Sequence, residues 1–130
     1  MRLYLIRHAE SAPGEPDALR PLTREGRKQA RELAARLAAE PVRPGVVLTS
    51  PLLRARQTGE EVARATGALT EPDDRLEPGA TTARVREAIA GRGEHVVVVG
   101  HQPDCGRIAA ELTGRPEPAF PAAGMVVIDL

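Results

Sequence analysis

Short apolar runs alternate with amphipathic segments along the whole chain. The apolar runs are rich in Leu, Val and Ile, as expected of β-strands, and lie at residues 2–6, 46–49, 95–100 and 125–130. A further short strand is expected near Leu69. Three segments with apolar positions at helical spacing predict helices at 24–40, 52–66 and 104–113. A shorter helix is expected to begin at Thr81 or Thr82 and to carry Val85 and Ile89 on one face.

This order of elements predicts an α/β fold. Strands that alternate with helices favour a three-layer α/β/α arrangement, in which helices cover both faces of a mostly parallel central sheet. Four consecutive valines, residues 96–99, suit a strand that is covered on both faces, and the last strand is expected at the sheet edge. Thr23 is predicted to cap the first long helix, and Gly67 and Gly114 to end the second and the last one.

The composition narrows the class of protein. The 18 basic and 18 acidic residues give a formal net charge of zero, which argues against a broad nucleic-acid-binding face or a polybasic membrane patch. Cys105 is the only cysteine, so no intrachain disulfide and no thiolate-based structural zinc site can form. No run approaches the roughly 18 apolar residues of a membrane span. We expect one domain over residues 1–130, a monomer in the cytoplasm.

Polar residues follow three of the predicted strands at the point where each strand ends. Arg7 and His8 follow the first strand, Ser50 follows the second with Arg54 about one turn into the next helix, and His101 follows the valine-rich strand. The carboxyl ends of parallel strands share one sheet edge, which is where open α/β sheets bind ligands. The pattern therefore predicts two imidazoles and two guanidinium groups in one site.

This set of side chains suits phosphoryl transfer. Guanidinium groups bind phosphate oxygens in a bidentate manner. A neutral imidazole is a competent nucleophile near neutral pH, and neighbouring arginines disfavour its protonated form. Because the arginines supply the positive charge, no metal or other cofactor is required for this chemistry.

Four motifs in the right order resemble the histidine phosphatase superfamily, which also contains the cofactor-dependent phosphoglycerate mutases. They are Arg7-His8, Leu22-Thr23-x-x-Gly26, Ser50-Pro51-x-x-Arg54-Ala55-x-Gln57-Thr58 and Gly100-His101. The short chain, the Arg20-Pro21-Leu22-Thr23 segment and Gly100-His101-Gln102-Pro103 look most like the phosphohistidine phosphatase SixA subgroup. The resemblance covers nearly the whole chain.

The resemblance implies a role for each residue. His8 would be the nucleophile and form a phosphohistidine intermediate that water hydrolyses, while Arg7, Arg54 and His101 would bind the phosphoryl group. Arg20 is placed to reach a phosphate or an acidic part of the substrate. Two further residues are expected to line the pocket, Ser11 and Gln102.

One position departs from the larger relatives. These use a carboxylic acid after the second helix to protonate the leaving group, and Glu77 is the candidate for that role here. The SixA subgroup often lacks a clear acid, which a phosphohistidine substrate would explain. Glu77 is therefore either a general acid or a loop surface residue.

Several alternatives stay open. The implied substrate is phosphohistidine in a protein, but a phosphomonoesterase acting on a small phosphorylated metabolite and a non-catalytic phosphate-binding regulator are the competing hypotheses. A phosphoglycerate mutase is disfavoured because the chain has little length for enclosing a sugar acid. A metal site made of His101, Asp104 and Cys105 is disfavoured because Cys105 falls on the apolar face of its helix.

Overall fold

The computed structural model describes all residues, 1–130, and contains one five-stranded sheet. Its strands are β1 (Arg2–Arg7), β2 (Val46–Thr49), β3 (Leu69–Pro72), β4 (His95–Gly100) and β5 (Met125–Asp129), in the order β3-β2-β4-β1-β5. All neighbouring pairs are parallel except β1 and β5, which are antiparallel. The predicted mostly parallel sheet, with the last strand at its edge, is confirmed.

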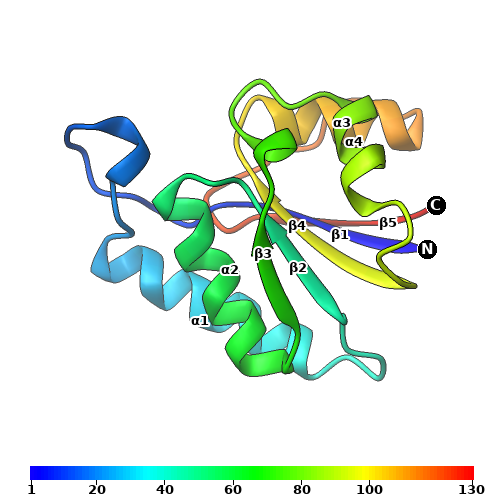
Figure 1. Ribbon diagram of the computed structural model, residues 1–130, viewed down its shortest axis with the longest axis horizontal. Helices are drawn as coiled ribbons and strands as arrows, with labels where there is room; N and C mark the ends of the chain where they lie inside the picture. Colours follow the sequence, from blue (N-terminus) through cyan, green and yellow to red (C-terminus); the bar gives the residue numbers. More distant parts are fainter.

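Two pairs of helices cover the two faces of the sheet. The first pair is α1 (Arg24–Ala38) and α2 (Leu53–Thr66), which lie below the sheet in Figure 1, and the second is α3 (Thr82–Ile89) and α4 (Asp104–Thr113), which lie above it. Two short 3₁₀ turns, η1 (Asp17–Leu19) and η2 (Asp74–Leu76), interrupt the loops. The three-layer α/β/α prediction is therefore confirmed.

Strand β4 shows how the apolar pattern builds two cores. Val96 and Val98 belong to the cluster packed under α3 and α4, whereas Val97 and Val99 belong to the cluster packed under α1 and α2. All four side chains are at most 1% exposed. Full burial of a valine stabilises the fold by about 1.5 kcal/mol or more, so a run of four apolar residues is favoured only where both faces are covered.

The helix ends follow local chemistry. The Thr23 side chain accepts a hydrogen bond from the Gly26 N–H, and Gly67 and Gly114 adopt left-handed conformations with φ of 78° and 70°. Helix α1 stops at Ala38 rather than at residue 40. Ala39 caps it with φ of −83° and ψ of −9°, and Glu40 directly precedes Pro41, which disfavours the helical conformation at that position. Helix α2 begins at Leu53, one residue later than predicted, since Leu52 is extended.

Two glycines allow helices to pack closely against the segments around the strand ends. A Cβ atom on Gly59 of α2 would lie 2.4 Å from Thr49 Cγ2 of β2, and one on Gly26 of α1 would lie 2.0 Å from the Glu10 carbonyl oxygen. Both distances are far inside van der Waals contact. The missing side chains therefore let α2 pack close to β2, and α1 close to the loop that follows β1.

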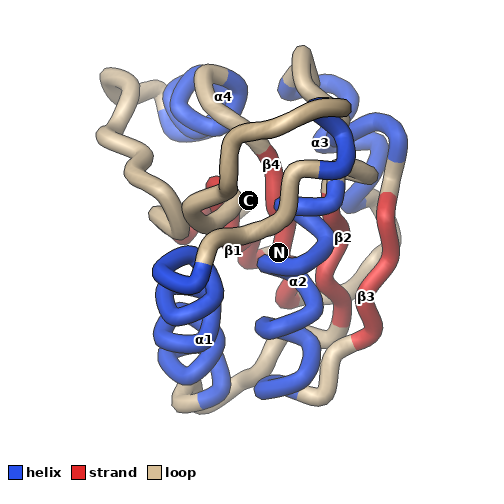
Figure 2. Tube along the Cα trace, turned by 90° about the vertical axis from the view of Figure 1, so that its left-hand side faces the viewer, coloured by secondary structure: helices blue, strands red, loops and turns tan.

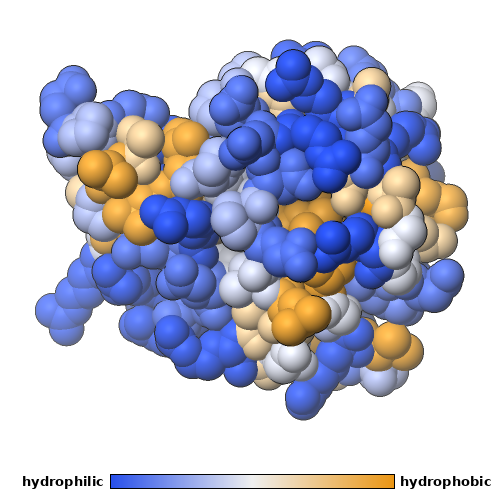
Figure 3. Space-filling model, in the orientation of Figure 1, coloured by the Kyte–Doolittle hydropathy of each residue, from blue (hydrophilic) through white to orange (hydrophobic).

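The surface shows no large continuous apolar face in the view of Figure 3, where apolar atoms form separate patches within a mostly hydrophilic surface. None of the helices combines the length and the apolar character that crossing a membrane requires.

Candidate active site

Three parallel strands end at one edge of the sheet. Arg7 pairs with Gly100 at the ends of β1 and β4, and Thr49 of β2 pairs with Val99 of β4. The chain after β1 stays in register, since the His8 N–H donates to the Gly100 carbonyl at 3.0 Å. Figure 2 looks onto this edge, where the loops cross between the two helical layers. The predicted convergence of strand ends is present.

The imidazole of His8 lies in this edge, with its ring centroid 5.1 Å from that of His101. Its Nδ1 atom lies 2.7 Å from the Ala9 carbonyl oxygen. A carbonyl only accepts hydrogen bonds, so Nδ1 carries the proton and Nε2 keeps its lone pair. Burial, followed by the charges of Arg54, Arg7 and Arg20, lowers the pKa of His8 to about 4. His8 is therefore neutral at pH 7.

His101 is buried and held by Ser50. Its Nε2 lies 2.7 Å from Ser50 Oγ, which also accepts the Leu52 N–H at 3.2 Å. His101 is the only acceptor within reach of the buried Ser50 hydroxyl, so this hydroxyl donates to Nε2 and the ring proton is assigned to Nδ1. His101 Nδ1 is buried without a partner. Burial and the proximity of His8 lower the pKa of His101 to about 3.

Arg54 stands in the first turn of α2 and is only 6% exposed. Its Nη1 donates to the Asp17 carbonyl at 2.9 Å and its Nη2 to Asp17 Oδ2 at 3.3 Å, whereas its Nε is buried without a partner. A cation at a helix N-terminus opposes the helix dipole, which agrees with a function other than helix stability. Asp17 was not predicted as a site residue, because in the sequence it is one of several acidic residues in a loop.

Arg7 is anchored by the loop that precedes β5. Its Nη1 donates to the Phe120 carbonyl at 2.9 Å, and its Nε is buried without a partner. Its charge lowers the pKa of His8, so Arg7 contributes to the field around the imidazole. Buried donors without partners are rare in folded proteins. Arg7, Arg54 and His101 each present one, which is the composition expected of an anion-binding site.

The remaining candidates lie in different surroundings. Arg20 donates from Nε to Asp17 Oδ1 at 3.0 Å and from Nη1 to Ser11 Oγ at 3.1 Å, so these residues form one network with Arg54. Gln102 is exposed, and its Oε1 accepts the Gly106 N–H at the start of α4. Glu77 is exposed after η2, and its carboxylate makes no hydrogen bond or ion pair.

Two motif residues support the loop that follows His8. The Ala9 N–H donates to Thr58 Oγ1 at 3.0 Å, and the Thr58 hydroxyl donates to the Arg54 carbonyl. Gln57 Oε1 accepts the Leu22 N–H at 2.8 Å. Residues three and four positions after Arg54 share its helix face, and this spacing is the signal that could have identified both supports.

The alternative metal set is not assembled. The Sγ of Cys105 points to the Ile6 carbonyl, and burial raises the pKa of Cys105 to about 12, which disfavours the thiolate that binds metals. The Asp104 carboxylate accepts hydrogen bonds from Gly79 and Arg107. No group of three His, Cys, Asp or Glu side chains is arranged to hold a metal ion.

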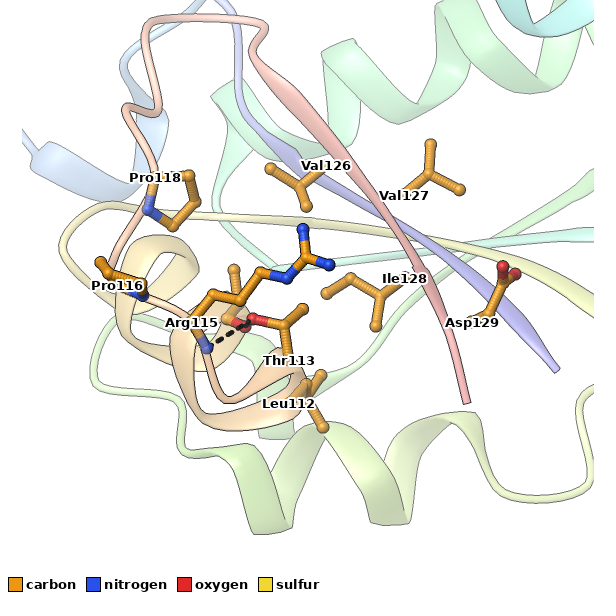
Figure 4. Close-up of a pocket in the computed structure, with 10 residues that line it drawn as sticks. Leu112, Thr113, Arg115, Pro116, Pro118, Val126, Val127, Ile128 and Asp129 are labelled. Atoms are coloured by element: carbon orange, nitrogen blue, oxygen red, sulfur yellow. Dashed lines mark hydrogen bonds between the residues drawn. The ribbon is translucent and has the colours of Figure 1, made fainter.

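The largest surface cavity, of about 490 Å³, lies away from the strand ends that carry His8 and His101. It lies between α4 and β5 and is lined mainly by residues 112–118 and 126–129, with the Arg115 side chain extending across it (Figure 4). It contains no histidine and none of the residues that surround His8. Volume alone therefore does not mark the reactive site in this protein.

Comparisons with known proteins agree with this geometry. The family model described as histidine phosphatase superfamily (branch 1) matches residues 3–80. The phosphohistidine phosphatase SixA of Escherichia coli is 32% identical over the whole chain and 86% of its own length. An uncharacterized protein of Picosynechococcus is 39% identical over 84% of this chain and 71% of its own. The structure of the protein histidine phosphatase SixA complexed with tungstate superposes with a TM-score of 0.90 and 31% identity, covering 100% of this chain and 88% of that one.

The sequence matches extend over the strand ends that carry Arg7, His8 and Arg54, and the structural match extends over the entire sheet and both helical layers. The chain therefore belongs to the histidine phosphatase superfamily, branch 1, and is a phosphatase.

Proposed function

We propose that this phosphatase transfers the phosphoryl group of a phosphohistidine in a protein to its own His8, and then hydrolyses it without a metal. The observation that carries the proposal is the neutral His8 imidazole, whose Nε2 lone pair is free beside the unpaired donors of Arg7, Arg54 and His101. Together they supply a nucleophile and fixed positive charge.

In the first step, His8 Nε2 forms a bond to phosphorus while the bond from phosphorus to the substrate breaks. The free N–H groups of Arg7 and Arg54 and the Nδ1–H of His101 donate to the phosphoryl oxygens. The Ala9 carbonyl holds the His8 Nδ1 proton and stabilises the positive charge that develops on the ring. In the second step, water attacks phosphorus, the bond to Nε2 breaks, and inorganic phosphate leaves.

The leaving group determines whether an acid is needed. When the second ring nitrogen of a phosphohistidine is protonated, the imidazole takes the bonding electron pair and departs neutral. An alkoxide leaving group would instead need a proton from the enzyme. Glu77 is the sequence-based candidate for that role, but it is exposed and bonded to no site residue. The arrangement favours a phosphoramidate over an ester.

The lack of an enclosing pocket around His8 and Arg54 favours a protein as the phosphoryl carrier. No cavity in the structure includes His8 or Arg54 in its lining. A small metabolite is usually bound by a pocket that buries most of its surface, whereas a histidine on another protein can be presented to a shallow site. Two of the similar proteins are described as phosphohistidine or protein histidine phosphatases, and one of them was solved with tungstate, a tetrahedral oxyanion like phosphate.

The decisive experiment is covalent labelling. The chain is incubated with a protein carrying ³²P-labelled phosphohistidine in the presence of EDTA and is quenched within milliseconds to seconds at alkaline pH. We expect label on the wild type and on His95→Ala, a control at the opposite end of β4, and none on His8→Ala. Turnover that required a divalent metal and survived His8→Ala would refute the mechanism.

The competing functions give different results in the same assay. A phosphomonoesterase acting on a small metabolite would be labelled by small esters with a higher kcat/KM than by phosphohistidine protein. A phosphate-binding regulator would bind phosphate or tungstate but turn over neither substrate. The phosphohistidine proposal requires the phosphoramidate to have the highest kcat/KM.

A further inference from the structure

Asp17 connects two of the arginines at the candidate site. Its Oδ1 accepts the Arg20 Nε–H at 3.0 Å, its Oδ2 accepts from Arg54 Nη2 at 3.3 Å, and its carbonyl accepts from Arg54 Nη1 at 2.9 Å. Asp17 lies three positions before Arg20 and 37 positions before Arg54, so the bridge joins the loop after β1 to the start of α2. Hydrogen bonding from Arg20 lowers the pKa of Asp17 below its usual range.

The bridge lies at the open end of the site. The Arg54 side chain is 7% exposed, whereas the Asp17 side chain is 64% exposed. The loop that carries Asp17 projects from the body of the molecule on the carboxyl side of β1 (Figure 1). A phosphoryl group bound by Arg54 would share that arginine with the exposed Asp17 carboxylate, which places the Asp17 charge next to the solvent-facing part of the substrate.

The negative charge of Asp17 acts across the site. It raises the pKa of His101, against the larger lowering by burial, by His8 and by Arg54, so its field reaches the second imidazole. Arg7, Arg20 and Arg54 supply three positive charges and Asp17 removes one. The two that remain match a phosphoryl dianion, and no positive charge is left over for a second anionic group.

We propose that Asp17 is a specificity-determining residue, whose carboxylate disfavours phosphorylated substrates that carry a second negative charge next to the phosphoryl group. Substrates with a neutral or cationic carrier, such as a phosphohistidine with a protonated ring, are favoured. The inference rests on the proposed function and gives its substrate class a physical basis. It also assigns Arg20 to holding Asp17, rather than to binding an acidic part of the substrate.

The test compares two esters that differ by one charge, phenyl phosphate and 4-carboxyphenyl phosphate, together with a phosphohistidine peptide. The variants are Asp17→Asn, which removes the charge and keeps one oxygen acceptor, and the control Asp74→Asn, on the other 3₁₀ turn. We expect the wild type and the control to prefer phenyl phosphate, the ester without the carboxylate. In Asp17→Asn the ratio of the two kcat/KM values should fall by about fivefold to tenfold, the effect of one charge at close range.

Ionic strength provides a second readout. The preference of the wild type should shrink as salt is raised from about 20 mM to about 500 mM, and the ratio in Asp17→Asn should respond much less. If Asp17 only braced Arg54, its replacement would lower kcat/KM for both esters by the same factor. An unchanged ratio in an Asp17→Asn enzyme that still labels on His8 would therefore overturn this inference and leave the proposed function intact. Loss of the His8 dependence would overturn the proposed function instead.

Discussion

Replacing Gly26 by alanine tests how the first helix positions the loop after His8. In an ordinary helix this change stabilises by about 0.5–1 kcal/mol. Here the new Cβ would lie 2.0 Å from the Glu10 carbonyl oxygen and 2.9 Å from its carbon, both backbone atoms. Ordinary contact begins near 3.4 Å, so α1 and the 9–10 segment must separate by about 1.4 Å, the difference between the two distances. Overpacking of this kind costs about 1–3 kcal/mol or more, which exceeds the helix gain.

The displaced segment contains the carbonyl that orients His8. The Ala9 oxygen accepts the Nδ1 proton of His8, so a shift of about 1 Å there misdirects Nε2 and should reduce kcat/KM by about 100-fold. The net loss of stability should lower Tm by about 5–10 °C.

Gly45→Ala is the control, because nothing lies within 4 Å of its added Cβ and its φ is not left-handed. Tm is measured by circular dichroism, and turnover with the phosphohistidine protein. A Gly26→Ala enzyme that matched Gly45→Ala in both would refute the argument.

Three further outcomes are expected. Because the pKa of His8 is about 4 and that of His101 about 3, both below the 6.5 of an unfolded histidine, kcat/KM should decline only below about pH 5. As the pH falls, histidines of the unfolded state take up protons at a higher pH than those of the folded state, so the free energy of unfolding should decrease between pH 6.5 and 4. A kcat/KM that already declines at pH 6.5 would contradict these pKa values. Ser50→Ala should lower kcat about tenfold by releasing the His101 tautomer, and ¹⁵N NMR showing the wild-type proton on Nε2 would disprove the assignment. Thr58→Val leaves the Ala9 N–H unpaired, so the free energy of unfolding in urea should fall by about 1–3 kcal/mol and activity should fall with it. The control Thr66→Val removes the same kind of hydroxyl-to-carbonyl bond on α2 and should lower stability without lowering activity.

The sequence by itself determined the elements and the edge of the sheet that carries the chemistry. A run such as Val96–Val99 favours a strand covered on both faces, and amphipathic spacing in 24–40 and 52–66 predicts helices with one buried side. Once the strands are parallel, His8 and His101 must follow at one edge. These inferences were available because they depend on local periodicity and on chain direction, both of which are written in the order of residues.

Only the tertiary structure decided which atoms meet at that edge. Asp17 lies 37 residues from Arg54, His101 lies 51 from Ser50, and the Phe120 carbonyl lies 113 from Arg7. Such partners depend on how loops cross over the strand ends, and no periodicity encodes that. The tertiary structure also decides where individual groups point. Glu77 follows η2 and lies in solvent, and the contact between α1 and Glu10 holds the segment whose carbonyl bonds to His8. A hydrogen bond needs atoms placed within tenths of an ångström, and only the packed chain fixes positions that closely.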